Sequence, residues 1–463
     1  ARTALAATKN GNMVTMFGAT GEDASSGSNC RLMAQNGQLR KSTDGGATWS
    51  APLPAAEGFC GAQCRYDIAV AVDPSAPARV YIGGSAESSC SSPFKRSTDG
   101  GTTFSSTDDG LHADMHSIVI APSNPSIIYT GNDGGIFRST DRGTTWQSLN
   151  TPGFSATQFQ SIAVHPTDPN FFIGGTQDNG SLVFDSNRDW RQIDFGDGGY
   201  TLIDQNATNT KKVLMYHTYF NVPGTFLAFA TIGSPISASA GNWTVLGCGS
   251  GATSNGIGCS DTAVLFYAPM ALGPGNPNTV YFGTDRLYRS PKKGKKMKVV
   301  SQGPIVHGVP ISSIGISPQD DNIRIVGVAD GEVFASTDGS SNMTEVTSPD
   351  FPSEFVARAV IDPHDSNTAY VTFSGFGDQP GMHVWKTSNL KGGASTWVAA
   401  GNGIPDAPVS AFVIDPANSG NLYAGTDIGV FRSTDGGATW IPFSEGLPKV
   451  AVFDMAIQRS SRT

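Results

Sequence analysis

Apolar residues recur along this chain in one phrase that repeats many times. A short apolar run leads into Asp-Pro or a close variant, an Asn- and Pro-containing loop follows, and a second apolar run ends near a Gly. The clearest copy spans residues 411–416 and 421–426. Short apolar runs bounded by Pro, Asn and Gly are typical of β-strands joined by tight turns. The phrase therefore predicts a pair of neighbouring antiparallel strands.

A second phrase follows the first, and we name it the Asp turn. Its copies read Ser-Thr-Asp-x-Gly-x-Thr and then Trp or Phe, at residues 42–49, 97–104, 139–146 and 433–440. A weaker copy at 336–343 keeps only the initial Ser-Thr-Asp-Gly. A short Asp side chain accepts hydrogen bonds from backbone N–H groups a few residues on, and Gly adopts positive φ without a Cβ clash. We therefore expect a strand, a tight turn and a second strand that begins at the aromatic residue.

Joined together, the two phrases describe a four-stranded antiparallel sheet that recurs along the whole chain. Where the Asp turn has decayed, Trp190, Trp243 and Trp397 still mark the fourth strand. Repeats of short strands at a spacing of ~45 to 55 residues are typical of the blades of a β-propeller. The sequence thus predicts an all-β fold, a single β-propeller domain over residues 1–463 with nine blades, within a range of seven to ten.

The C-terminal residues 452–457 repeat the pattern of a first strand, but no further strands follow them. We expect this C-terminal strand to complete the N-terminal blade, because a closed ring leaves no open sheet edge. The alternative is that residues 4–8 already form the first strand of the first blade and that the natural chain continues past Thr463.

Composition limits the partners and the compartment. The net charge is -9 and only 15% of residues are charged, so no basic face is available for nucleic acid. No apolar stretch approaches the ~18 to 20 residues that a transmembrane helix needs. The six cysteines are Cys30, Cys60, Cys64, Cys90, Cys248 and Cys259. They predict disulfides and a secreted, periplasmic or cell-surface location, with six buried thiols as the alternative.

The spacing of the cysteines indicates which of them can pair. Cys248 and Cys259 bracket one Gly- and Ser-rich loop, so we expect them to bond to each other. Of the three ways to join the remaining four, Cys30–Cys60 with Cys64–Cys90 is sterically easiest, although the sequence leaves the connectivity open.

The Asp turns resemble those of the Asp-box, or bacterial neuraminidase repeat, β-propellers, and the resemblance covers essentially the whole chain. That superfamily includes sialidases, xyloglucanase-like glycoside hydrolases, sortilin-type receptors and photosystem assembly factors, so the resemblance implies the fold more than the function. It implies that the Asp turns are structural and that ligands bind at the opposite end of the blades. A sialidase is not favoured, because the chain has no Arg-Ile-Pro sequence.

An enzymatic alternative follows from the same resemblance. The phrases at 132–138 and 426–432 resemble the one that carries a catalytic Asp in the xyloglucanase family. A glycoside hydrolase needs two carboxyl groups ~5 to 9.5 Å apart. Asp133 and Asp197 are our candidate pair, because the loops around them depart most from the repeat.

The end of the blades opposite the Asp turns, which we name the loop face, carries the other candidate residues. His112, Asp114 and His116 alternate along an expected extended segment, so they are expected to converge and to bind a polar ligand or a metal ion. Gln177, Asp178 and Asp427 lie in turns of the same end. The alternative for all of them is a hydrogen-bonded turn. No cofactor is predicted, although the acidic loops leave room for a structural cation.

These observations favour a binding or interaction module. We expect a secreted or cell-surface β-propeller that presents disulfide-braced loops to a glycan or a protein partner. A glycoside hydrolase that acts on a polysaccharide through a pair of Asp carboxylates is the alternative function.

Overall fold

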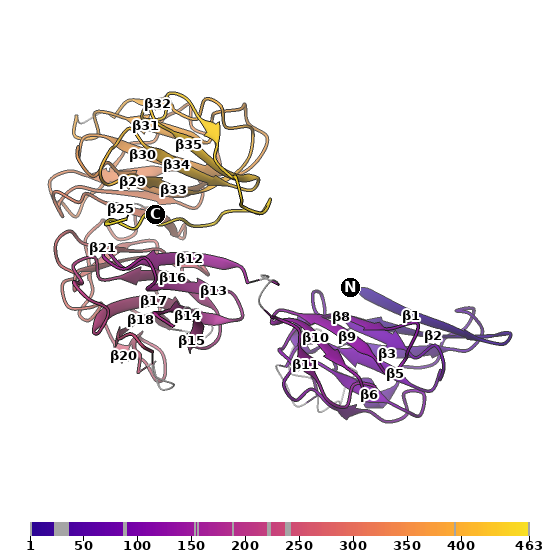
Figure 1. Cartoon of the computed structure of the whole chain (residues 1–463). Coiled ribbons are helices and arrows are strands. Elements are labelled where there is room, and N and C mark those ends of the chain that lie inside the picture. The colour runs from indigo at the N-terminus through magenta and orange to yellow at the C-terminus, as the bar shows by residue number, and fades with distance from the viewer. Residues whose placement is uncertain are drawn as a thin grey trace. The chain divides into compact units, whose positions relative to one another are not determined.

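The computed structural model describes residues 2–22, 37–86, 90–151, 154, 157–187, 189–219, 224–236, 242–392 and 395–461 (Figure 1). In these ranges the regular structure consists of strands and two short 3-10 helices, η1 (Pro54–Ala56) and η2 (Gly61–Gln63). The predicted all-β class is confirmed. None of the helices in the described ranges is long and apolar enough to cross a membrane.

The chain divides into two compact units, Ala1–Thr157 and Gln158–Thr463. In the first unit the strands are β1 (Thr3–Asn10), β2 (Met13–Thr20), β3 (Gln38–Ser42), β4 (Ala69–Val72), β5 (Val80–Gly83), β6 (Lys95–Ser97), β7 (Ser105–Ser106), β8 (Met115–Ile120), β9 (Ile128–Asn132), β10 (Gly135–Ser139) and β11 (Gln147–Ser148).

The strands of the second unit repeat in the same way along the chain. They are β12 (Phe159–Val164), β13 (Phe172–Thr176), β14 (Gly180–Phe184), β15 (Trp190–Asp194), β16 (Gly198–Ile203), β17 (Val213–Tyr219), β18 (Thr225–Ile232), β19 (Thr244–Gly247), β20 (Thr253–Ser254), β21 (Met270–Leu272), β22 (Val280–Gly283), β23 (Leu287–Ser290), β24 (Lys298–Val299), β25 (Ile311–Ile316), β26 (Arg324–Val328), β27 (Val333–Ser336), β28 (Thr344–Glu345), β29 (Phe355–Ile361), β30 (Ala369–Ser374), β31 (Val384–Thr387), β32 (Trp397–Ala399), β33 (Val409–Ile414), β34 (Leu422–Thr426), β35 (Gly429–Ser433) and β36 (Ile441–Pro442).

The described strands form nine sheets, and seven of these have four strands joined in sequence order. The other two are the three-stranded sheet β1–β3 and the five-stranded sheet β16–β20, whose last pair is parallel. The predicted β-propeller class and its nine blades are confirmed by these sheets. Three sheets lie in the first unit and six in the second. A single domain over residues 1–463 stays a prediction.

Burial changes in a regular way across each sheet. The second strands β5, β22 and β26 are buried at every position, because each is flanked by strands on both sides and covered by neighbouring sheets. The fourth strands β7, β24 and β28 are two residues long and exposed at both positions. Short outer strands limit the unpaired edge that each blade presents to solvent.

The Asp turns satisfy their own hydrogen bonds. In the last sheet the Asp435 carboxylate accepts bonds from the Thr439 backbone N–H (2.9 Å) and hydroxyl (2.6 Å). The Ser433 hydroxyl donates to Asp435 (2.7 Å) and accepts from the backbone N–H of Gly437 (3.0 Å). These bonds, the Thr439 hydroxyl first among them, lower the pKa of Asp435 to about 2. The carboxylate is thus used in holding the turn.

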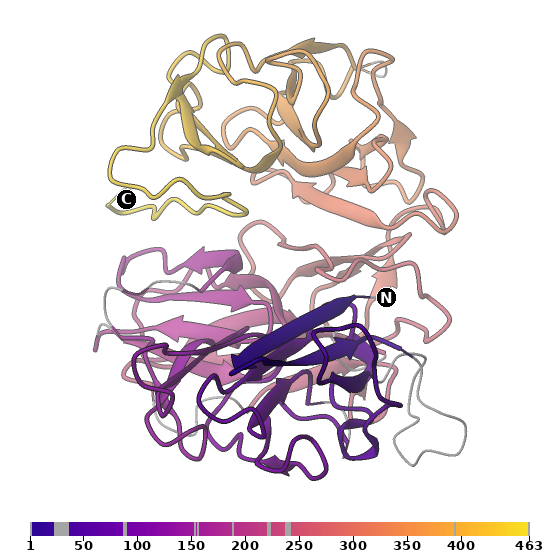
Figure 2. The ribbon, with the colours of Figure 1, turned by 90° about the vertical axis from the view of Figure 1, so that its right-hand side faces the viewer.

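The C-terminal segment does not complete the N-terminal blade, and that prediction is wrong. Strand β1 pairs with β2 and is itself the first strand of its sheet, as the alternative had it. Residues 451–458 are not a strand and lie in the second unit, where the Val452 N–H donates to the Thr426 carbonyl (3.0 Å). Figure 2 shows this segment as an extended yellow chain beside the last sheet. The segment has the apolar and polar pattern of a first strand, but it lies against the first strands of the second unit and pairs with no sheet.

The disulfides differ in part from the prediction. Cys248 bonds to Cys259, as expected. Cys60 bonds to Cys64, four residues away, so the favoured Cys30–Cys60 and Cys64–Cys90 pairing is wrong. The 3-10 helix η2 between Cys60 and Cys64 brings their Cα atoms to 5.1 Å. Cys90 is disulfide-bonded as well, and Cys30 lies outside the described residues.

Candidate functional site

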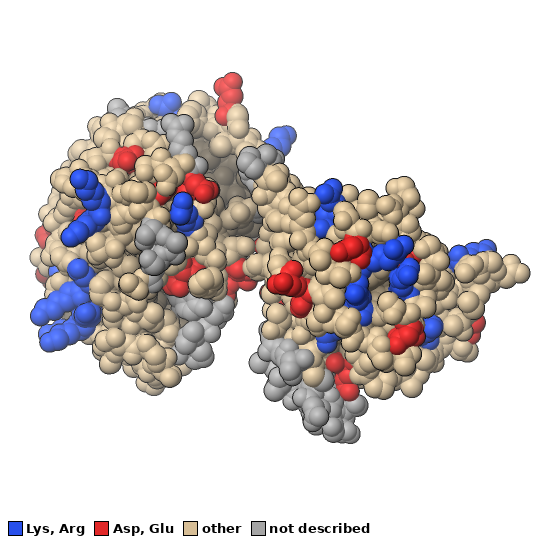
Figure 3. Space-filling model, turned by 60° about the horizontal axis from the view of Figure 1, so that its bottom comes forward, with Lys and Arg blue, Asp and Glu red and all other residues tan. Residues whose placement is uncertain are grey.

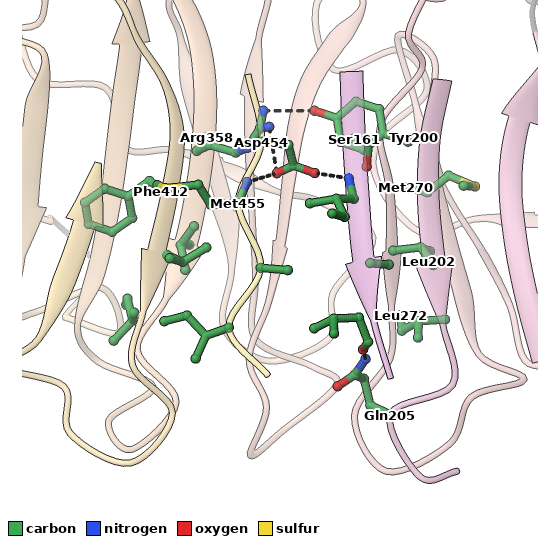
Figure 4. Close-up of a pocket in the computed structure, with 18 of the residues that line it drawn as sticks. Ser161, Tyr200, Leu202, Gln205, Met270, Leu272, Arg358, Phe412, Asp454 and Met455 are labelled. Carbon is green, nitrogen blue, oxygen red and sulfur yellow. Dashed lines mark hydrogen bonds and ion pairs between the residues drawn. The ribbon is translucent and has the colours of Figure 1, made fainter. Parts of the chain in front are cut away.

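A central cavity in the second unit is lined by the first strand of each of its six sheets. These strands are β12, β16, β21, β25, β29 and β33, and residues 454–457 of the C-terminal segment complete the wall. The cavity has a volume of about 470 Å³. Figure 4 shows Asp454 and Met455 between the strand that carries Ser161 and the strand that carries Arg358.

A buried ion pair fixes the C-terminal segment in the cavity wall. The Arg358 guanidinium lies 3.2 Å from an Asp454 oxygen, and the two side chains are 16% and 17% exposed. The other Asp454 oxygen accepts a hydrogen bond from the Ile162 N–H (2.9 Å). Arg358 also donates to the Tyr200 hydroxyl (3.1 Å) and to the Phe453 carbonyl (2.8 Å). Burial raises the pKa of Tyr200, so this phenol stays neutral.

The mouth pocket lies where the first strands begin, and it has a volume of about 370 Å³. Antiparallel order places these strand starts at the end opposite the Asp turns, which is the loop face. The pocket combines aromatic rings with small polar groups. Its lining includes Phe266, Tyr267, Phe355 and Phe453 together with Gln160, Ser312, Ser374 and Ser410.

Two adjacent aromatic residues form the most accessible part of the mouth pocket. Phe266 is 39% exposed, and its ring meets the Tyr267 ring edge to face at 4.9 Å. The Tyr267 hydroxyl donates to the Gln177 side-chain oxygen (2.7 Å). Burial, and then the charges of Asp197 and Asp178, raise the pKa of Tyr267. Exposed rings beside hydroxyl and amide groups match the two faces of a sugar, one apolar and one hydrogen-bonding.

The structure brings together three of the predicted residues at this mouth. Gln177 bonds to Tyr267, and the Asp178 backbone N–H donates to Asp197 (2.9 Å). Asp197 is 5% exposed, and Asp178 has a φ of 62°. Asp427 is half-buried in the turn between β34 and β35. The sequence indicated Gln177, but Phe266 and Tyr267 lie in a stretch without repeat character and gave no signal.

The histidine segment belongs to the first unit. The His116 ring lies 2.5 Å from an Asp133 oxygen on one side and 3.5 Å from Asp67 on the other. The alternation that was expected to align His112, Asp114 and His116 is broken, because Asp114 has a φ of 63°. Asp114 instead accepts a hydrogen bond from the Gln63 side chain (3.2 Å).

The backbone around His112 is held by its neighbour strand. The Asn132 side chain donates to the His112 carbonyl (3.2 Å), and the His112 ring lies 3.2 Å from the Ala113 carbonyl. Asp67 is fully buried, and the sequence did not single it out. The candidate catalytic pair is divided between units: Asp133 belongs to the first and Asp197 to the second.

On the face drawn in Figure 3, most of the surface is uncharged, and Lys and Arg gather in a few groups, some of them beside Asp and Glu. That nucleic acid is not a partner stays a prediction.

The comparisons with known proteins give a partial family match and distant structural likenesses. A family model described as Sortilin, neurotensin receptor 3 (Sortilin-Vps10) matches residues 92–218. No curated protein matches the chain.

The structural likenesses are to proteins of several kinds. A GH74 enzyme from Niastella koreensis is 17% identical, with 95% of this chain and 77% of that one covered and a TM-score of 0.34. YCF48 from Cyanidioschyzon merolae is 13% identical, with 66% of this chain and 89% of that chain covered and a TM-score of 0.43. Raptor from Chaetomium thermophilum is 9% identical, with 66% of this chain and 27% of that chain covered and a TM-score of 0.46. What the site can bind is therefore inferred from the residues of this chain alone.

Proposed function

We propose that this chain is a glycan-binding module and that the mouth pocket of the second unit is its binding site. The observation that carries the proposal is the lining of that pocket, in which Phe266 and Tyr267 stand beside Gln160 and three serines. Aromatic rings bury the apolar face of a sugar, while hydroxyl and amide groups fix its orientation. The lining is mostly apolar, and its charged side chain, Arg358, is already paired with Asp454, which favours a neutral saccharide over a charged ligand.

Several features support binding rather than turnover. The match of residues 92–218 to a receptor family model agrees with a binding role. Exposed apolar side chains on neighbouring loops, Phe376 (66%) and Ile428 (54%), extend the apolar area beyond the pocket for a polymer. The Cys60–Cys64 and Cys248–Cys259 disulfides support an oxidising, extracytoplasmic compartment.

A glycan array probed with the labelled full chain tests the proposal. We expect retention on at least one class of neutral polysaccharide and competition by a free oligosaccharide of that class. No retention on any neutral glycan would overturn the proposal.

A glycoside hydrolase is the second candidate, and the position of Asp197 favours it. This carboxyl group is buried next to Tyr267, at the edge of the mouth pocket. Reducing-end release from the retained polysaccharide, abolished in Asp197→Asn, would establish hydrolysis. Retention without release in the wild type leaves binding as the function.

A further inference from the structure

A cluster of titratable side chains lies on the loop face of the second unit, at the end of the sheet β29–β32. Glu354 immediately precedes β29, Asp378 lies in the loop between β30 and β31, and His383 immediately precedes β31. Each offers a ligand atom, and these atoms all lie within 4.8 Å of one another. A fourth residue, Asp406, comes from the connection that leads into β33.

His383 is the best-fixed member of the cluster. It is 1% exposed, and its Nε2 lies 2.9 Å from an oxygen of Asp406. Asp406 is itself held by the backbone N–H of Gly377 (3.0 Å). In the neutral tautomer whose Nε2–H donates to Asp406, Nδ1 carries a lone pair on the side of Glu354. Nδ1 is buried without a hydrogen-bond partner in the described chain, 3.5 Å from Glu354.

The carboxylates of the cluster also lack partners. One oxygen of Glu354 and one of Asp378 are buried with no hydrogen bond from any described residue. In the described ranges no Lys or Arg forms an ion pair with Glu354, Asp378 or Asp406. Two carboxylates this close together, each with a buried oxygen, are stabilised by a bound cation or by a shared proton.

The backbone makes room for the Glu354 carboxyl group. Gly375 lies directly against it, and a Cβ at that position would come within 2.1 Å of the Glu354 carboxyl carbon. A side chain at residue 375 would therefore displace the carboxyl group. The loop that follows reaches Asp378 through Gly377, which has a φ of 103° that favours Gly.

We propose that Glu354, Asp378 and His383 bind a divalent transition-metal ion such as Zn²⁺ or Mn²⁺, and that Asp406 orients His383. One imidazole nitrogen with two carboxylates suits these ions better than Ca²⁺ or Mg²⁺, which prefer oxygen ligands alone. A carboxylate that holds the far nitrogen of a histidine is the usual support for such a ligand. Three protein ligands leave one position for water.

The proposed metal site lies beside the mouth pocket, but metal binding does not require that the pocket binds a glycan. Phe355 and Ser374, which line the mouth pocket, are each one residue away in sequence from Glu354 and Gly375. A bound ion would tie the loop of residues 375–383 to the start of β29. The site would therefore exist whether or not a glycan binds.

Titration calorimetry of the metal-stripped full chain with Zn²⁺ and with Mn²⁺ tests the proposal. We expect one ion per chain for at least one of the metals. Asp378→Asn, at a half-buried loop position, and Glu354→Gln should each weaken the affinity at least tenfold. Asp406→Asn should weaken it about ten- to a hundredfold through the histidine alone. Glu332→Gln, at a comparable turn on the same face, is the matched control and should not change it.

A melting curve recorded with and without the metal gives the second readout. Metal should raise the melting temperature of the wild type and of Glu332→Gln, but not that of Asp378→Asn, because binding stabilises only a folded site. The proposal is overturned if the wild type binds neither metal at a defined stoichiometry. It is also overturned if Asp378→Asn binds as tightly as the wild type.

Discussion

Replacing Asp454 by Ala tests whether the C-terminal segment is part of the second unit. The change leaves the Arg358 guanidinium buried without its carboxylate and removes the acceptor of the Ile162 N–H. Removing one partner of a buried ion pair costs about 3 to 5 kcal/mol. We therefore expect the free energy of unfolding of the second unit to fall by that amount. Asp454→Asn keeps an oxygen acceptor and should cost less.

Native-state hydrogen exchange followed by mass spectrometry measures this loss for each unit separately. Each loss of about 1.36 kcal/mol in the free energy of unfolding speeds amide exchange tenfold. Amides in β12 and β29 should therefore exchange faster by roughly two to nearly four orders of magnitude. Peptides of the first unit serve as the internal control and should not change. The double variant Arg358→Met with Asp454→Leu should recover part of the protection, because it leaves no unpaired charge. Exchange within tenfold of the wild type in Asp454→Ala would refute the reasoning.

Three further predictions concern the blades themselves. Asp435→Asn should lower the melting temperature at neutral pH. Because hydrogen bonds, that from the Thr439 hydroxyl first, lower the pKa of Asp435 to about 2, its stabilising contribution is complete above the unfolded pKa of about 3.9 and is lost as the pH falls through about 2. The difference from the wild type should therefore shrink as the pH falls from about 4 to about 2, and a difference that does not shrink would contradict this. Gly315→Ala should lower the free energy of unfolding in urea by about 1 to 3 kcal/mol, because the new Cβ would lie 2.4 Å from a carbonyl oxygen of the neighbouring first strand. Gly258→Ala, where the atom nearest the new Cβ is 3.6 Å away, should be tolerated. Equal effects of the two variants would argue against tight packing of the first strands. Cys259→Ser should lower the free energy of unfolding by about 3 kcal/mol, since the Cys248–Cys259 disulfide closes a loop with a sequence separation of 11. An unchanged midpoint of urea unfolding would show that the loop is already ordered without the disulfide.

The sequence predicts the blades well because each blade is a local structure. Strand periodicity, the Asp turn and the aromatic that follows it all act within about 50 residues, so nine sheets can be placed without knowledge of their neighbours. Trp397 illustrates this: it begins β32 as expected, although its Asp turn has decayed.

Long-range features could not be predicted in the same way. Residues 452–457 carry a first-strand pattern, but only the fold shows that Asp454 meets Arg358 and Ile162 rather than the N-terminal sheet. The Cys60–Cys64 bond depends on a short 3-10 helix that Gly- and Ser-rich spacing does not reveal.

The site was predicted only in outline. The loop face and Gln177 follow from departures from the repeat, but alternation fails at Asp114, where a positive φ reverses the direction of the side chain. His383 and Glu354 escaped notice because each is an isolated polar residue beside a strand. They meet only when β29 and β31 pair with β30 in one sheet, a contact between residues far apart in sequence.

The central claim is that the mouth pocket binds a glycan. Isothermal titration of the array's best-retained oligosaccharide into wild type, Phe266→Ala and Phe443→Ala tests it most directly. Phe266 is 39% exposed in the mouth pocket, and Phe443 is 50% exposed next to the outer strand β36. We expect Phe266→Ala to weaken binding about ten- to a hundredfold, because the burial of one aromatic ring is lost, and Phe443→Ala to leave binding unchanged. Unchanged binding in Phe266→Ala, or an equal loss in both variants, would contradict it.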